Sequence, residues 1–261
     1  MRGIDFDFKV SMVADLIVQS KDIVVFTGAG VSTESGIPDF RSPGGIWTRF
    51  DPEDFTIDRF LSSRETRKKT WELLGSSGVI ADALPNRAHL AVYELELLGK
   101  LTCVITQNID NLHQKAGCSP DRVFELHGNM QWVRCLGCGT RISMQAVRER
   151  LGPENPVPEC EHCSGILKPD VIYFGESLPQ ETLDRAIHHS RTCDLFIVIG
   201  SSLSVYPAAY MPTYALDSGA RLVIVNNTRT FCDDRADVVI NSMAGVAMER
   251  ILEETKRKLL H

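Results

Sequence analysis

The chain has 261 residues, of which 43% are hydrophobic and 24% are charged, which is enough apolar material for one large domain carrying a smaller one. Its formal net charge of −6 argues against a surface that neutralises phosphates, so we expect no direct nucleic-acid binding and favour a basic peptide as partner. The sequence shows neither a secretory signal nor an apolar run long enough to span a bilayer. We therefore expect a cytoplasmic protein without membrane contact, in which clustered cysteines bind metal more often than they form disulfides.

Short runs rich in β-branched residues predict buried parallel strands. These runs lie at 23–27, 101–106, 195–199 and 222–225. Segments with helical spacing lie before, between and after them, at 12–19, 87–98, 180–190 and 246–260. The alternation predicts an α/β fold built on a doubly wound, parallel, Rossmann-like sheet.

Two stretches interrupt this alternation. The first, 36–84, is mixed in charge and dotted with Gly, Pro and Ser, which indicates a cofactor loop followed by a helical insertion. The second, 130–169, carries two CxxC pairs and indicates a small inserted metal-binding module. The remaining segments, 1–35, 85–129 and 170–261, are expected to build the Rossmann-like domain.

The two CxxC pairs are Cys135 with Cys138 and Cys160 with Cys163. Two such turns about 20 residues apart give four thiolates within tetrahedral reach of one zinc ion. Because sulfur would fill all four positions, we predict a structural zinc rather than a catalytic one. A redox pair or two disulfides are the alternatives, and His162 could replace one ligand. The other four cysteines are expected to be small apolar core residues.

The first predicted strand runs into Gly28, Ala29 and Gly30. Small residues there would let backbone amides approach a pyrophosphate, although a tight turn without ligand is the alternative. Thr33 replaces the third glycine of the dinucleotide fingerprint, and no acidic residue closes a second strand about 20 positions later. A conventional dehydrogenase is therefore disfavoured.

Polar side chains follow the second predicted strand, in the segment 106–110, which reads TQNID. Amide and carboxylate groups at the carboxyl end of a strand lie where an open α/β sheet usually binds its ligand. A helix cap formed by Asn108 or Asp110 is the alternative.

One histidine, His127, stands between an apolar strand and Gly128. A neutral imidazole is the side chain best suited to accept a proton near pH 7. A lone histidine is nevertheless more often structural, and this is what we expect of His89 and His113, which lie in helical spacing.

Several of these motifs together resemble the sirtuin family. Residues 28–41 match its pattern GAGxSxxSGIPDFR at every fixed position; TQNID at 106–110, HG at 127–128, the CxxC pairs and the segment 168–176 follow in order. The resemblance covers about 22–252 and is closest to the bacterial and archaeal single-domain members. It implies NAD-dependent removal of acyl groups, chiefly acetyl, from protein lysines, giving nicotinamide, O-acyl-ADP-ribose and free lysine. NAD would be consumed as co-substrate.

The resemblance also implies roles for individual residues. His127 would be the general base and Asn108 the second catalytic residue. The implied NAD contacts are Gly28, Ala29, Gly30, Ser32, Thr33, Phe40, Arg41, Gln107, Asn108, Ile109, Asp110, His127, Gly200, Ser201, Ser202, Asn226 and Met243. The acylated-lysine peptide would pair with two backbone segments, at Ile172, Phe174, Gly175 and Glu176 and at Val205 and Tyr206.

Other readings remain open. Leu74 and Ser77 stand where sirtuins that remove acidic acyl groups carry Tyr and Arg, so we expect a neutral acyl group. An ADP-ribosyltransferase or NAD hydrolase would use the same bond cleavage with another acceptor. A non-catalytic NAD-sensing or peptide-binding module is a further alternative, and hydride transfer a more distant one. We expect a monomer.

Overall fold

The computed structural model describes the backbone of residues 2–48, 50–76 and 78–260, without the side chains of 2–4, 74–76, 78 and 79. Its larger sheet is parallel throughout and has the strand order β3-β2-β1-β7-β8-β9. The strands are β1 (Ile23–Thr27), β2 (Leu101–Thr106), β3 (Val123–Glu125), β7 (Leu195–Ile199), β8 (Arg221–Val225) and β9 (Val238–Ile240). The predicted doubly wound α/β sheet is confirmed.

The strand order reverses between β1 and β7. From β1 the chain winds outward through β2 to β3, and from β7 it winds the other way through β8 to β9. Loops that leave neighbouring strands in opposite directions open a crevice at their carboxyl ends, which is where open α/β sheets bind ligands. We therefore expect the ligand site at the carboxyl ends of β1, β2, β7 and β8.

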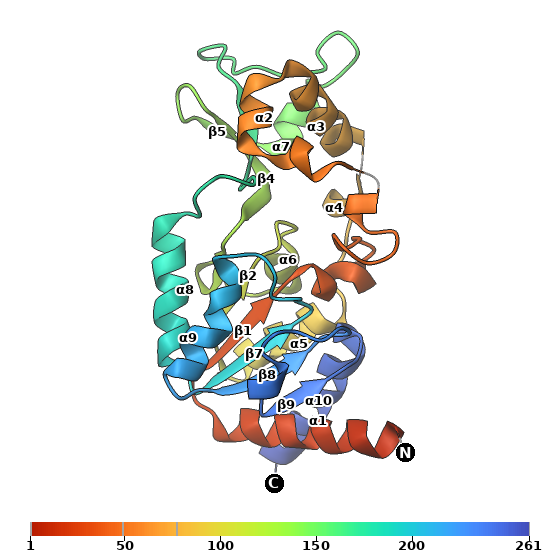
Figure 1. Cartoon of the computed structure of the whole chain (residues 1–261), viewed down its shortest axis with the longest axis vertical. Helices are drawn as coiled ribbons and strands as arrows, with labels where there is room; N and C mark the ends of the chain where they lie inside the picture. The colour runs from red at the N-terminus through yellow and green to blue at the C-terminus, as the bar shows by residue number, and fades with distance from the viewer. Residues whose placement is uncertain (1, 49, 77, 261) are drawn as a thin grey trace.

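Helices cover both faces of this sheet (Figure 1). On one face lie α1 (Arg2–Gln19), α5 (Arg87–Leu97) and α10 (Ala244–Leu259); on the other lie α8 (Gln180–Thr192) and α9 (Met211–Asp217). Successive residues of a strand point to opposite faces. In β1, accordingly, Val25 lies in the core shared with α1, α5 and α10, and Phe26 lies in the core shared with α8 and α9.

The predicted amino-terminal helix was too short, since α1 begins at Arg2 rather than at residue 12. Charged residues dilute the apolar signal of its first half. Burial of Val10, Val13 and Ile17 in the core with α10 holds the helix in place. The other three predicted helices match α5, α8 and α10 to within two residues at each end.

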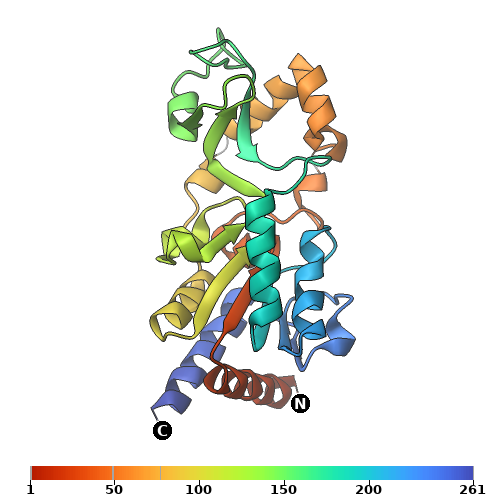
Figure 2. The ribbon, with the colours of Figure 1, turned by 90° about the vertical axis from the view of Figure 1, so that its left-hand side faces the viewer.

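A second, antiparallel sheet has the order β5-β4-β6 and lies at the far end of the molecule from the termini (Figures 1 and 2). Its strands are β4 (Gly128–Cys135), β5 (Arg141–Ser143) and β6 (Leu167–Val171), with α7 (Met144–Arg148) following β5. The motif at 168–176 therefore begins within β6, a strand of the small sheet.

The helical insertion packs on this small sheet. It contains α2 (Ile57–Ser62), α3 (Arg64–Ser76) and α4 (Gly78–Ala81). Phe60 of α2 and Trp71 of α3 are buried in one core with Val133 of β4 and Leu167 of β6. The two interruptions of the sequence pattern thus share a single hydrophobic core.

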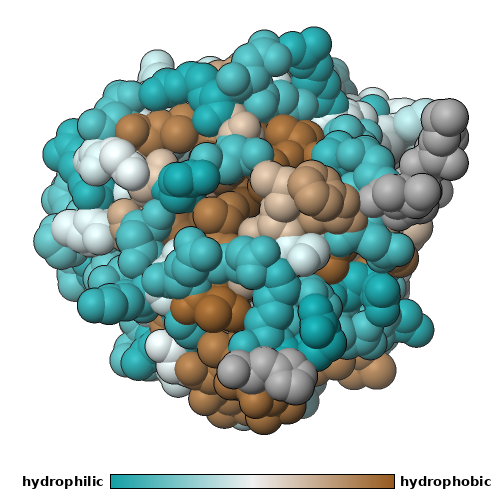
Figure 3. Space-filling model, turned by 90° about the horizontal axis from the view of Figure 1, so that it is seen from below, coloured by the Kyte–Doolittle hydropathy of each residue, from teal (hydrophilic) through white to brown (hydrophobic). Residues whose placement is uncertain are grey.

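Figure 3 views the end of the molecule that carries both termini, where hydrophilic residues surround several separate apolar areas. Among the residues with described structure, none of the helices has the length and apolarity needed to cross a bilayer.

Candidate functional site

Backbone segments cross closely at the point where the strand order reverses. The Gly30 amide donates to the Gly200 carbonyl at 2.8 Å. A Cβ atom at Gly28 would lie 2.9 Å from that carbonyl oxygen and one at Gly30 only 2.7 Å, while Gly200 has a φ of +61°. These glycines are therefore required by contact between the β1 and β7 loops, which the sequence could not reveal.

A buried polar network joins the ends of β1 and β2. Asn108 Nδ2 donates to the Gly28 carbonyl at 3.2 Å and to Ser32 Oγ at 3.0 Å, and Ser32 Oγ donates to Asp110 Oδ2 at 2.7 Å. Asp110 Oδ1 accepts from the Leu112 amide at the start of α6 (Leu112–Ala116). Asp110 therefore belongs to the predicted polar cluster and also accepts a hydrogen bond at the start of a helix, which was the alternative. The side chain of Asn108 contributes its hydrogen bonds to the cluster.

The imidazole of His127 lies against the neighbouring loop. Its Nδ1 is 3.0 Å from the Gln107 carbonyl oxygen. Burial lowers the pKa of His127 below its ordinary 6.5, against the opposing effect of that hydrogen bond, so the ring is neutral at pH 7. A carbonyl can only accept, so Nδ1 carries the proton and Nε2 keeps a lone pair. The Gln107 side chain in turn donates to Ser201 Oγ at 2.9 Å, which ties this site to the end of β7.

The predicted cofactor loop carries an aromatic cluster. The ring of Phe40 lies 5.1 Å from Trp47, which also contacts Phe55 at 5.3 Å and Phe174 at 6.1 Å between centroids. Phe40 and Arg41 are exposed. The loop is thus joined to the segment expected to hold the peptide.

Three further expected NAD contacts lie next to three different elements. Ser202 follows β7 and is exposed, Asn226 follows β8 and is buried, and Met243 precedes α10 and is 48% exposed. The structure adds a contact that the sequence did not indicate. Glu34, in the turn η1 (Ala29–Ser35), accepts from the Gly245 amide at 2.5 Å, so a carboxylate caps the amino end of α10.

The first expected peptide segment is already paired along one edge. Phe174 exchanges backbone hydrogen bonds with 55–57, since its amide donates to Phe55 and its carbonyl accepts from Ile57, both at 3.0 Å. Ile172 donates to the His127 carbonyl at 2.9 Å. Gly175 lies one position further along the chain and is exposed. It has a φ of +89° and belongs to the turn that the Glu176 amide closes on the Tyr173 carbonyl at 3.0 Å.

A buried ion pair supports the same segment and was missed in the sequence. The Lys168 ammonium lies 3.0 Å from Glu176 Oε2, which also accepts from the Tyr173 amide at 2.7 Å. Glu176 was expected to touch substrate, but this oxygen is engaged within its own segment. In the second expected peptide segment, Val205 is half-buried and Tyr206 is 54% exposed.

The four CxxC cysteines come together as predicted. The sulfur atoms of Cys135, Cys138, Cys160 and Cys163 all lie within 4.8 Å of one another. The closest pairs, at 3.5 and 3.7 Å, are too far apart for disulfides, whose sulfur atoms lie ~2.05 Å apart. His162 does not belong to this cluster within the described part of the chain.

The surroundings of the sulfur atoms fit a zinc ion. A hydrogen bond with Thr140 lowers the pKa of Cys138 to about 6. The backbone amide of Gly165 lowers the pKa of Cys163, but the Cys135 and Cys138 sulfurs outweigh it and raise that pKa to about 12. Four thiols this close together cannot all lose their protons without a compensating positive charge. A divalent cation supplies that charge and stabilises the four thiolates.

The remaining four cysteines are buried, as predicted. Burial raises the pKa of Cys103, Cys118 and Cys193 to about 12 and that of Cys232 to about 11. They are unreactive core residues at neutral pH.

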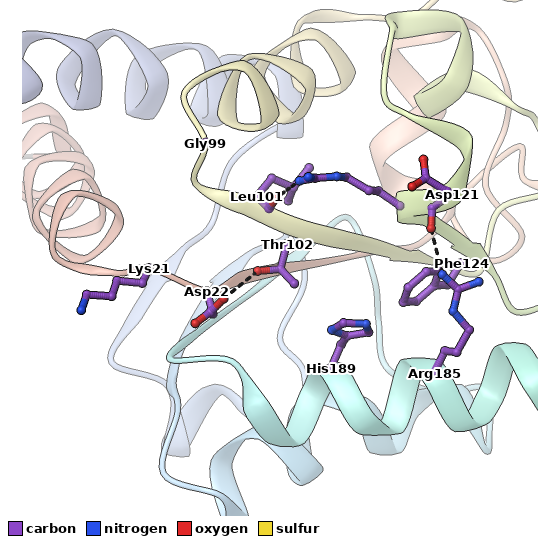
Figure 4. A pocket seen from close by; sticks show the side chains of 10 residues that line it. Lys21, Asp22, Gly99, Leu101, Thr102, Asp121, Phe124, Arg185 and His189 are labelled. Atoms are coloured by element: carbon purple, nitrogen blue, oxygen red, sulfur yellow. Dashed lines mark hydrogen bonds between the residues drawn. The ribbon is translucent and has the colours of Figure 1, made fainter.

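A separate hollow of about 400 Å³ opens at the other end of the strands (Figure 4). Its lining includes Asp22, Arg122, Arg185 and His189, and the Arg185 guanidinium lies 4.2 Å from the centre of the Phe124 ring. It sits at the amino ends of β1 and β2, away from the polar network described above, and we do not assign the candidate site to it.

The fold and the switch-point crossing define the class, a doubly wound α/β protein of the dinucleotide-binding kind with a small cysteine-rich module. The Sir2 family model matches residues 28–207. NAD-dependent protein deacetylase 1 of Bradyrhizobium diazoefficiens is 48% identical over 94% of this chain and 96% of its own length. NAD-dependent protein deacylase 2 of Archaeoglobus fulgidus is 43% identical, over 95% and 97%.

Solved structures agree with these relatives. A Sir2 structure with a p53 peptide and NAD+ aligns with a TM-score of 0.84 at 40% identity, covering 93% of this chain and 97% of its own. A Sir2 protein bound to a propionylated peptide gives 0.82 at 40% identity, covering 93% and 96%. The chain belongs to the Sir2 family, the sirtuins, and the resemblance seen in the sequence is confirmed.

Proposed function

We propose that this protein is an NAD-dependent protein deacylase that removes acetyl groups from lysine side chains, releasing nicotinamide, O-acyl-ADP-ribose and free lysine. The observation that carries the proposal is His127, which burial keeps neutral and whose Nδ1 is bound to the carbonyl of Gln107, the residue that precedes Asn108 and its hydrogen-bond network. Relatives that match nearly the whole chain are named deacetylases and deacylases, which supports the same activity.

The chain's own residues fit the chemistry. When bound, NAD supplies a ribose carbon that becomes electrophilic as nicotinamide leaves. His127 Nε2 then accepts a proton from a ribose hydroxyl, as a general base with a pKa below 6.5 can do at neutral pH. Asn108 is held through Ser32 by Asp110 and orients the ribose and a water molecule.

The four-cysteine cluster would hold one zinc ion with a closed coordination shell. A closed shell leaves no position for water or substrate, so the ion contributes to the folding of the module rather than to the reaction. Cβ atoms at Gly137 and Gly165 would lie 3.2 and 3.1 Å from cysteine sulfurs, so these glycines leave room around the metal.

We propose an acylated-lysine peptide as the substrate, bound between Gly175 and the Val205 and Tyr206 segment. Pairing through main-chain groups gives affinity with modest sequence selectivity. The preference for a neutral acyl group rests on Leu74 and Ser77 in the sequence; Ser77 and the side chain of Leu74 lie outside the described residues. A monomeric, cytoplasmic enzyme stays a prediction from the sequence.

Product masses test this function. The purified chain is incubated with NAD and a panel of acetyl, butyryl, succinyl and myristoyl lysine peptides. Acylated ADP-ribose together with free lysine peptide is the expected result, with little turnover of the succinyl peptide. ADP-ribosylated protein would instead favour an ADP-ribosyltransferase, and free ADP-ribose without deacylation an NAD hydrolase.

A further inference from the structure

Two buried histidines take no part in the chemistry described so far. His89 of α5 is 0% exposed and His113 of α6 is 1% exposed, and their ring centroids lie 5.0 Å apart at an angle of 61°. Within the described part of the chain, each ring leaves one nitrogen buried without a partner, Nε2 of His89 and Nδ1 of His113. A buried polar atom without a hydrogen bond is costly and calls for an explanation.

The contacts of His113 fix which of its nitrogens carries the proton. Thr27 Oγ1 donates its single proton to Thr106 Oγ1 at 2.8 Å, so it must accept from His113 Nε2, 2.9 Å away. Burial lowers the pKa of His113 well below its ordinary value, and the ring is neutral. The unpartnered Nδ1 is therefore a hydrogen-bond acceptor.

The same reasoning gives the opposite result for the unpartnered atom of His89. Its Nδ1 accepts from the Asn86 amide at 3.3 Å. Burial lowers the pKa of His89 to about 4 even though the Asp110 carboxylate raises it, and this ring is also neutral. The proton must then sit on Nε2, which is a donor.

A buried donor without an acceptor and a buried acceptor without a donor thus belong to two rings whose centroids lie 5.0 Å apart. We infer that His89 Nε2–H donates a hydrogen bond to His113 Nδ1 and that His113 is a positioning residue for Asn108. A centroid separation of 5.0 Å allows the ~2.7–3.2 Å of an N–H hydrogen bond once the two nitrogens are turned toward each other.

This bond closes a continuous chain of hydrogen bonds beneath the active site. The chain passes through Asn86, His89, His113, Thr27, Thr106 and the backbone amide of Asn108. At its far end, Asn86 Nδ2 donates to the Val31 carbonyl and to Ser35 Oγ in the turn η1. The pair therefore links the turn η1, which follows β1, to the turn that carries Asn108, and its catalytic purpose rests on the proposed function.

Nitrogen-15 spectra of the histidine rings in the full-length enzyme test the pair without any use of activity. The variants His89→Gln and His113→Gln assign the signals. We expect both rings to carry their proton on Nε2, with His113 Nδ1 shifted as a hydrogen-bond acceptor. A proton on His113 Nδ1, or an Nδ1 shift typical of a free lone pair, overturns the inference.

Kinetics test the positioning role. His113→Leu removes the donor to Thr27 and should lower kcat roughly tenfold while the KM for NAD changes less than about twofold. His113→Gln keeps an amide donor of similar reach and should recover most of kcat. A full kcat in folded His113→Leu refutes the positioning role.

A matched control separates positioning from stability. Thr255→Val removes a different fully buried donor, the hydroxyl that donates to the Ile251 carbonyl within α10 at 2.7 Å. It should lower thermal stability and leave kcat unchanged; an equal loss of kcat would overturn the positioning role of His113. If His113→Leu does not fold, the spectra of the wild type still decide on the pair. If the wild type lacks deacylation, the proposed function fails while the spectra still test the pair.

Discussion

Replacing Lys168 with Met should destabilise the enzyme and weaken peptide binding together. The ammonium has three protons and three acceptors: Glu176 Oε2 at 3.0 Å and the carbonyls of Val171 and Pro169 at 2.5 and 3.3 Å. Its side chain is only 7% exposed. Met fills a similar volume but removes the ammonium from the carboxylate and from both carbonyls.

The size of the effect follows from this geometry. Removing one partner of a buried ion pair costs ~3–5 kcal/mol. The Glu176 side chain is 21% exposed and keeps the Tyr173 amide as a donor, so partial hydration places the expected loss near the lower end, about 3 kcal/mol. The double variant Lys168→Met with Glu176→Gln should regain most of that loss, because replacing a buried pair as a whole is close to neutral.

Urea unfolding measures the free-energy change, and steady-state kinetics measure the KM for an acetyl-lysine peptide and for NAD. We expect the peptide KM to rise and the NAD KM to stay unchanged, since the pair supports the backbone next to Gly175. A loss below about 0.5 kcal/mol for Lys168→Met, typical of a surface substitution, would refute the reasoning.

Three further predictions concern other parts of the molecule. Because burial lowers the pKa of His127 below 6.5 and the neutral ring is the active base, kcat/KM should fall only when the pH drops through that lowered pKa; half-maximal activity at pH 6.5 or above would contradict this. Atomic emission should find one zinc per chain, lost in Cys138→Ser and retained in Cys118→Ala; retention in both would count against the cluster as the ligand set. Glu34→Gln removes the charge that caps α10 and should lower the free energy of unfolding by about 1 kcal/mol in thermal melts. An unchanged melting temperature would show that the charge does not stabilise the helix.

The sequence predicts the parts of the fold that depend on local patterns. The continuous β-branched runs of β1, β2 and β7 match their observed bounds, because strands buried on both faces need no polar alternation. The edge strands β3 and β9 have three residues each, which is too short for a periodic signal. The cysteine cluster is predictable because two turns of fixed spacing suffice to bring the sulfurs together.

Contacts between distant segments are what the sequence does not reveal. Gly28 and Gly30 were predicted to make room for a pyrophosphate, and the structure shows that they also make room for the backbone of Gly200. In the sequence, Lys168 is one charged residue of a motif. Only the folded structure shows that its ammonium is buried and hydrogen-bonded to Val171 and Glu176. His113 has helical spacing, and nothing local indicates the threonine pair that fixes its tautomer.

The role of His127 is tested most directly by one comparison of products. His127→Ala and the wild type are each incubated with NAD and an acetyl-lysine peptide, and free lysine peptide and O-acyl-ADP-ribose are quantified by mass. We predict that the variant stays folded, binds NAD with unchanged affinity and loses most deacylation. Turnover near that of the wild type would contradict the assignment of His127 as the general base.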